Sequence, residues 1–91
     1  MNPEPQSESL LSFPCVFPIK LMGRREDGFA QTVVEIVQRH AADFHAGTME
    51  MRSSKNARYL SLTVTLNARS REQLDALYSE LSKHPMVIMV L

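Results

Sequence analysis

The 91-residue sequence has few of the residues that cross-link small domains. Its single cysteine, Cys15, excludes a disulfide within the chain, which is typical of proteins from a reducing cytoplasm. We interpret Cys15 as a small core side chain, because no neighbour indicates an activated thiol. The three histidines, His40, His45 and His84, fall on different segments without a further ligand at metal-binding spacing. We therefore expect no metal site. Cys15 and the histidines also lack the spacing of a nucleophile–base pair that is typical of an enzyme.

Excess charge and long apolar runs are also absent. Ten lysines and arginines balance ten acidic residues, whereas dedicated nucleic-acid-binding domains usually carry surplus positive charge. No run of about 18 apolar residues could span a bilayer, and no secretory leader is recognisable. Only three glycines occur, and Gly23 and Gly28 form neither a dinucleotide fingerprint nor a P-loop. We expect a cytoplasmic protein with no cofactor and no membrane partner, and the balanced charge argues against a nucleic-acid partner.

Regular alternation marks one strand around which the fold can be built. From Tyr59 to Ala68, apolar residues at even positions alternate with hydroxyl and amide side chains at odd positions. Successive strand side chains face opposite sides, so this strand has one buried and one solvated face. The polar segment 52–58 before it is typical of a hairpin tip. An earlier strand over residues 16–22 contains Pro18, which should weaken a central position or require a bulge there.

Two segments carry the apolar spacing of helices. The first runs from Phe29 to His40, with Asp27 as the expected N-cap. The second begins at a capping box formed by Ser70 and Gln73 and ends before His84-Pro85. The spacing therefore predicts two amphipathic helices, one after each long strand.

The remaining segments complete a split βαβ pattern. Residues 49–52 predict a short edge strand with a charged outer face, and residues 86–91 predict a last strand that alternates between two apolar faces. Residues 1–9 are expected to form a disordered tail, so that one domain spans residues 10–91. The order strand, helix, strand, strand, helix, strand predicts a ferredoxin-like α+β fold. Its antiparallel sheet would have the order 4-1-3-2, with both helices on one face.

Several short runs strengthen this prediction by resemblance to a known family. The runs are Phe13-Pro14, residues 20–23, residues 33–41, Ser53-Ser54-Lys55, residues 65–68 and residues 89–91. In this order and spacing they resemble the YbeD-like family of small bacterial proteins. The resemblance implies a fold similar to ferredoxin-like regulatory domains of the ACT type. It implies no catalytic residue.

This topology would bring several basic residues to one end of the domain. The loop after the first strand, the hairpin tip and the end of the second helix would meet beside the N-terminus of the first helix, whose N–H groups attract anions. We predict a site there for a small anionic metabolite or an acidic protein surface. Its candidate residues are Gly23, Arg24, Arg25, Ser53, Ser54, Lys55, Arg58 and Lys83. The alternative is a solvated rim, partly neutralised by Glu26 and Asp27.

Two other functions remain open at this point. The apolar last strand would be prone to association unless Leu10, Leu11 and Phe13 or a second subunit covered it, so the domain could act through protein–protein contact or homodimerisation. RNA binding, which this fold supports when aromatics occupy the open sheet face, is disfavoured because Ser61 and Thr63 stand there instead. We therefore expect a non-enzymatic regulatory or binding module.

Overall fold

The structure, a computed structural model, describes residues 12–91 and contains four strands and two α-helices. The elements are β1 (Cys15–Arg24), α2 (Phe29–His40), a short 3-10 turn η1 (Ala46–Thr48), β2 (Glu50–Ser53), β3 (Tyr59–Ala68), α3 (Arg71–Lys83) and β4 (Val87–Val90). The expected tail, residues 1–9, lies outside the described residues, as do Leu10 and Leu11.

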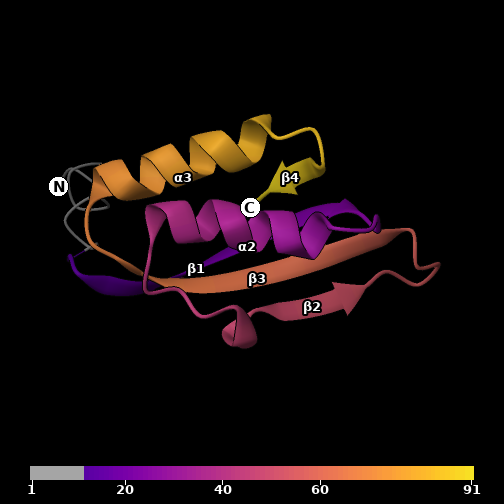
Figure 1. Cartoon of the computed structure of the whole chain (residues 1–91), viewed down its shortest axis with the longest axis horizontal. Helices are drawn as coiled ribbons and strands as arrows, with labels where there is room; N and C mark the ends of the chain where they lie inside the picture. Colours follow the sequence, from indigo (N-terminus) through magenta and orange to yellow (C-terminus); the bar gives the residue numbers. More distant parts are fainter. Residues whose placement is uncertain (1–11) are drawn as a thin grey trace, which may run out of the picture.

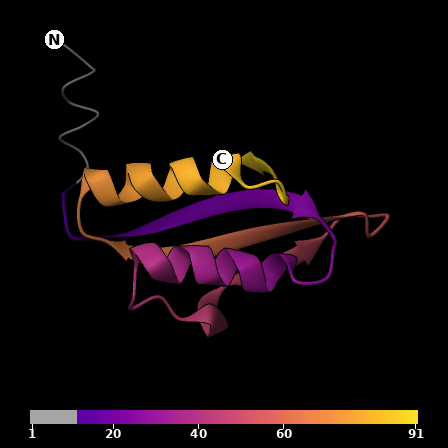
Figure 2. The same cartoon turned by 45° about the horizontal axis from the view of Figure 1, so that its top comes forward.

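The strands form one antiparallel sheet in the order β2-β3-β1-β4. Both helices cover the same face of this sheet, and the β2–β3 hairpin projects beyond them at one end (Figures 1 and 2). The predicted ferredoxin-like fold, including its strand order, is confirmed. No helix among the described residues is long and apolar enough to cross a membrane.

The core lies between the helices and the alternating face of β3. β1 and β3 pair along their whole length, with Ile19 opposite Val64 and Leu21 opposite Leu62. These four side chains are all buried beneath the helices. Cys15 is half-buried and packs against the same cluster, as expected for a small core side chain.

The start of α2 differs from the prediction, because Gly28 and not Asp27 is the N-cap residue. The chain turns tightly here, with the Phe29 N–H donating to the Glu26 carbonyl at 3.2 Å. Gly28 has φ 84°, a left-handed conformation that glycine adopts without the steric penalty of a Cβ. No side chain caps the helix, and its first turn contains no acidic residue.

The start of α3 follows the predicted capping box, and it also ties the two helices together. The Ser70 hydroxyl accepts the Gln73 backbone N–H at 3.1 Å. The Gln73 side chain accepts from the backbone N–H of Arg69 and donates to the His40 carbonyl at 2.6 Å. The His40 ring lies 2.7 Å from a Glu80 oxygen, so the end of α2 is joined to α3 at two places.

Pro18 needs no bulge, contrary to the sequence-based expectation. The Leu91 N–H donates to the Lys20 carbonyl at 2.7 Å, so the backbone groups of Lys20 face β4. Pro18, two residues earlier, faces the same way, but β4 pairs only with Leu21–Gly23. Within residues 12–91 the edge beside Pro18 is therefore unpaired, and the missing N–H forfeits no ladder bond.

The bulge lies instead in β4, and it makes the predicted alternation of the last strand wrong. Met22 is opposite Met89, whereas Gly23 is opposite Val87, so Ile88 is an extra residue. A bulge of this kind places two successive side chains on one side. Ile88 and Met89 are accordingly both exposed, at 51% and 45%.

Candidate functional site

The hairpin tip between β2 and β3 is held by a local hydrogen-bond network. The Ser54 hydroxyl accepts the Tyr59 N–H at 3.1 Å and donates to the Asn56 side-chain oxygen at 3.0 Å. The same oxygen accepts the Arg58 N–H at 3.3 Å. Ala57 has φ 58°, which completes the reversal. Because asparagine and serine side chains replace backbone partners here, the tip has a defined shape despite its exposure.

Three arginines converge where this tip meets the end of β1. Arg24 is opposite Tyr59 in the sheet, and the Arg25 N–H donates to the Arg58 carbonyl at 2.9 Å. Together they border an open hollow of about 410 Å³, here called the arginine hollow. Its lining residues are Arg24, Arg25, Glu26, Ala57, Arg58 and Tyr59.

The electrostatics of the arginine hollow favour an anion. Arg24, Arg25 and Arg58 supply three positive charges against one carboxylate, that of Glu26. The start of α2 lies beside one lining residue, because the Phe29 N–H donates to the Glu26 carbonyl at 3.2 Å, so the positive end of the helix dipole is close to the hollow. The ion pairs among the described residues join Arg39 and His40 to Glu80, and Arg71 to Asp75, so they leave the three arginines of the hollow available.

The other predicted site residues are placed differently. Gly23 is buried, and a Cβ there would lie 2.4 Å from both the Met86 carbonyl oxygen and the Phe29 ring, so its role is close packing. Ser54 shapes the hairpin tip, while Ser53 ends β2. Lys55 is exposed on the tip and Lys83 at the end of α3, and neither lines the arginine hollow.

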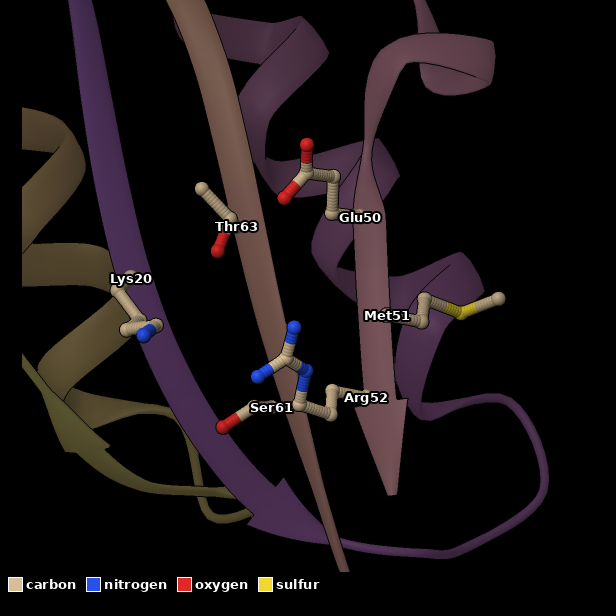
Figure 3. A pocket seen from close by; sticks show the side chains of 6 residues that line it. All are labelled: Lys20, Glu50, Met51, Arg52, Ser61 and Thr63. Carbon is tan, nitrogen blue, oxygen red and sulfur yellow. The ribbon is translucent and has the colours of Figure 1, made fainter.

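A second hollow, which the sequence pattern did not predict, lies on the open face of the sheet. It has a volume of about 550 Å³, and Figure 3 shows side chains from three neighbouring strands around it. We call it the sheet-face hollow; it is lined by Lys20, Glu50, Met51, Arg52, Ser61 and Thr63. These residues come from three separate segments of the sequence, and only the strand register brings the segments together.

A smaller hollow lies where the segment after α2 crosses the end of β3. The Asn67 amide donates to the Asp43 carboxylate at 3.1 Å, and this hydrogen bond lowers the pKa of Asp43 below its usual value. This smaller hollow has a volume of about 170 Å³, and His45 and Thr48 are among its lining residues. Over residues 12–91, no group of three or more His, Cys, Asp or Glu side chains is placed to hold a metal ion.

Several exposed large apolar side chains lie at separate places on or beside the open face. Val16 and Tyr59 project there from β1 and β3, and the β4 bulge adds Ile88 and Met89. Leu91, just after β4, is 66% exposed. The open face thus has an apolar border along β4 and a polar hollow toward β2.

The chain is similar in sequence to a family of bacterial proteins over nearly its whole length. A family model described as "Protein of unknown function (DUF493)" matches residues 8–91. The UPF0250 protein RSc0326 of Ralstonia nicotianae is 55% identical over 87 residues, which cover 96% of this chain and 90% of that protein. The UPF0250 protein NE1487 of Nitrosomonas europaea is 56% identical over 84 residues, covering 92% and 97%.

Solved structures show the same fold at low sequence identity. Protein HP0495 of Helicobacter pylori superposes with a TM-score of 0.73 at 18% identity, covering 89% of this chain and 85% of that one. The ACT domain of a GTP pyrophosphokinase from Chlorobium tepidum gives a TM-score of 0.65 at 14% identity, covering 85% and 83%. At these identities the similarity concerns the fold alone.

Proposed function

The chain belongs to the DUF493 family of UPF0250 proteins, and we propose that it is a non-enzymatic binding module that takes an anionic partner at the arginine hollow. Family membership confirms the resemblance seen in the sequence, and the fold is ACT-like. The observation that carries the proposal is the convergence of Arg24, Arg25 and Arg58 on one hollow in a chain whose formal net charge is zero.

The chemistry of arginine supports this choice of ligand. A guanidinium group stays charged at all physiological pH values and presents several N–H donors in one plane, which matches a carboxylate or phosphate group. The Arg25–Arg58 backbone hydrogen bond holds two of the three residues close together before any ligand arrives. Such preorganisation reduces the entropy lost on binding.

Two anionic partners fit the arginine hollow, a small carboxylate- or phosphate-bearing metabolite and an acidic protein surface. The β2–β3 hairpin projects beyond the helices (Figure 1). Two residues of its tip, Ala57 and Arg58, line the hollow and are exposed, so a partner can approach it from outside. A regulatory role follows if the partner is a metabolite whose level varies. We place this bacterial module in the cytoplasm, as the single cysteine led us to expect.

The proposal is tested by calorimetric titration of the intact protein with citrate, inorganic phosphate and a hexaglutamate peptide at low salt. We expect one of these probes to bind, with an affinity that falls as salt rises, because exposed charges are screened. Replacing Arg24, Arg25 and Arg58 together by glutamine should abolish this binding. Lys83→Gln, which removes one positive charge outside the hollow, is the control and should have little effect. Binding that survives the triple substitution would contradict the proposal.

A second candidate function is protein–protein association through the open face, including homodimerisation. The observation that favours it is the group of exposed side chains at β4, namely Ile88, Met89 and Leu91. Exposed apolar patches of this kind mark association surfaces in many proteins. Sedimentation at several concentrations tests it, with Ile88→Asp and Met89→Lys expected to shift any dimer toward monomer.

A further inference from the structure

We propose that the sheet-face hollow is a second, separate binding site, and that its ligand is a small zwitterion. Such a molecule carries an anionic carboxylate or phosphate group close to an ammonium group. The site lies on the open face of the sheet and shares no lining residue with the arginine hollow.

The strand register sets the arrangement of the side chains in this hollow. Lys20 on β1 is opposite Thr63 on β3, and Thr63 is opposite Glu50 on β2. Neighbouring strands lie about 4.8 Å apart, so the backbones of Lys20 and Glu50 stand roughly 10 Å apart with Thr63 between them. Arg52 and Ser61 form the next row. A small molecule lying on β3 would therefore have charged side chains on both sides and hydroxyl groups beneath it.

The positive groups of the hollow suit the anionic part of the ligand. Figure 3 shows the Arg52 side chain extending from β2 over β3, toward the strand that carries Lys20. The half-buried hydroxyls of Ser61 and Thr63 lie on the same face and can donate to an oxyanion. A carboxylate or phosphate above β3 would thus meet two cations and two hydroxyl donors.

Glu50 makes the hollow selective. Figure 3 shows its carboxylate turned toward Thr63, and no ion pair within residues 12–91 involves Lys20, Glu50 or Arg52. A simple anion would be attracted by Lys20 and Arg52 but repelled by Glu50. A simple cation would be attracted by Glu50 but repelled by Lys20 and Arg52. A zwitterion satisfies all three charges at once, which is why this class of ligand fits better than either ion alone.

The test is a titration of the intact protein followed by amide chemical shifts in two-dimensional NMR spectra. The probes are glycine and 2-aminoethyl phosphate as zwitterions, with acetate and methylammonium as the single-charge comparisons. We expect saturable shifts at residues 20, 50–52 and 61–63 for a zwitterion, with at least about fivefold weaker binding of either single ion. Tighter binding of glycine would indicate a carboxylate ligand, and tighter binding of 2-aminoethyl phosphate a phosphate ligand.

Variants separate this site from general surface binding. Glu50→Gln should weaken zwitterion binding and strengthen acetate binding, because it removes both the ammonium partner and the repulsion of the anion. Thr63→Val should weaken binding, whereas Thr65→Val, on the same face of β3 but outside the hollow, should leave it unchanged. Absence of saturable shifts at these residues, or zwitterion binding insensitive to Glu50→Gln, would overturn the proposal. Shifts confined to residues 24–26 and 57–58 would overturn it while supporting the arginine hollow.

Discussion

The backbone N–H of Arg25 donates to the carbonyl of Arg58 at 2.9 Å, which links the loop after β1 to the hairpin tip before β3. These residues are 33 positions apart in the chain and lie just outside the paired ends of their strands. The bond continues the antiparallel ladder by one step beyond the Arg24–Tyr59 pair. The arginine hollow is therefore an extension of the central strand pair, which gives exposed arginines a rigid base.

The hairpin tip contains a backbone strain that a substitution should relieve. Ala57 has φ 58°, in the left-handed region that costs an alanine roughly 1–2 kcal/mol and a glycine almost nothing. Ala57→Gly should therefore raise the free energy of unfolding, by up to about 1 kcal/mol after the extra entropy of glycine in the unfolded chain is subtracted. Urea denaturation measures it.

The control for Ala57→Gly is the same substitution in a helix. Ala76 is exposed within α3, where glycine is about 1 kcal/mol less favourable than alanine. Ala76→Gly should therefore lower the free energy of unfolding. If both variants lowered the free energy of unfolding, the conformation of Ala57 would not be strained.

Close packing at Gly23 should make that position intolerant of any side chain. A Cβ there would lie 2.4 Å from the Met86 carbonyl oxygen and from the buried ring of Phe29. Neither group is a flexible chain end, so Gly23→Ala should lower the free energy of unfolding by about 2–3 kcal/mol through overpacking. Gly47→Ala is the matched control, because nothing lies within 4 Å of its added Cβ. Thermal melts of the two variants would be expected to differ clearly, and equal melting temperatures would contradict the packing role of Gly23.

The Glu80 carboxylate should contribute measurably to the contact of α2 with α3. Glu80 forms an ion pair with Arg39 and a 2.7 Å hydrogen bond with the half-buried ring of His40. Glu80→Ala should lower the free energy of unfolding by about 1 kcal/mol, since both partners are only partly shielded from water. Asp75→Ala removes an exposed pair with Arg71 and should change stability by less than about 0.5 kcal/mol. Equal effects in urea denaturation would argue against a specific role for Glu80.

The sequence predicted most of the fold because its strongest signals are local. The alternation from Leu60 to Asn67 determines which face of β3 is buried, and the bounds of α2 match its apolar spacing. The errors arose where a single residue changes the backbone. Gly28 is the N-cap residue of α2 because it adopts a positive φ. Ile88 is an extra residue that forms a bulge in β4, and the alternation of apolar residues does not indicate a bulge.

The candidate sites were predicted less completely, because they depend on neighbours across strands. The proximity of Arg24, Arg25 and Arg58 could be predicted from topology alone, since each lies in a loop beside a predicted strand. Lys20 and Arg52 could not, because their proximity follows from the register of two strand pairs. A one-residue change of register would place such side chains on the opposite face. The side chain of Tyr59 also adds one aromatic to the open face, where the sequence had indicated none.

The Asp43–Asn67 hydrogen bond should be visible in the acid titration of the protein. The hydrogen bond from Asn67, the largest cause, holds the pKa of Asp43 below its usual value. A carboxyl whose folded-state pKa is depressed stabilises the fold at pH values above its unfolded-state pKa, and this stabilisation is lost as the pH falls through the folded-state value. Asn67→Ala should raise the pKa of Asp43 in an NMR titration and remove its share of the acid sensitivity of folding. Thr65→Ala, a neighbouring exposed position on β3, is the control and should leave the pKa of Asp43 unchanged. An Asp43 titration that is the same in Asn67→Ala and in the parent protein would show that the amide does not stabilise the carboxylate.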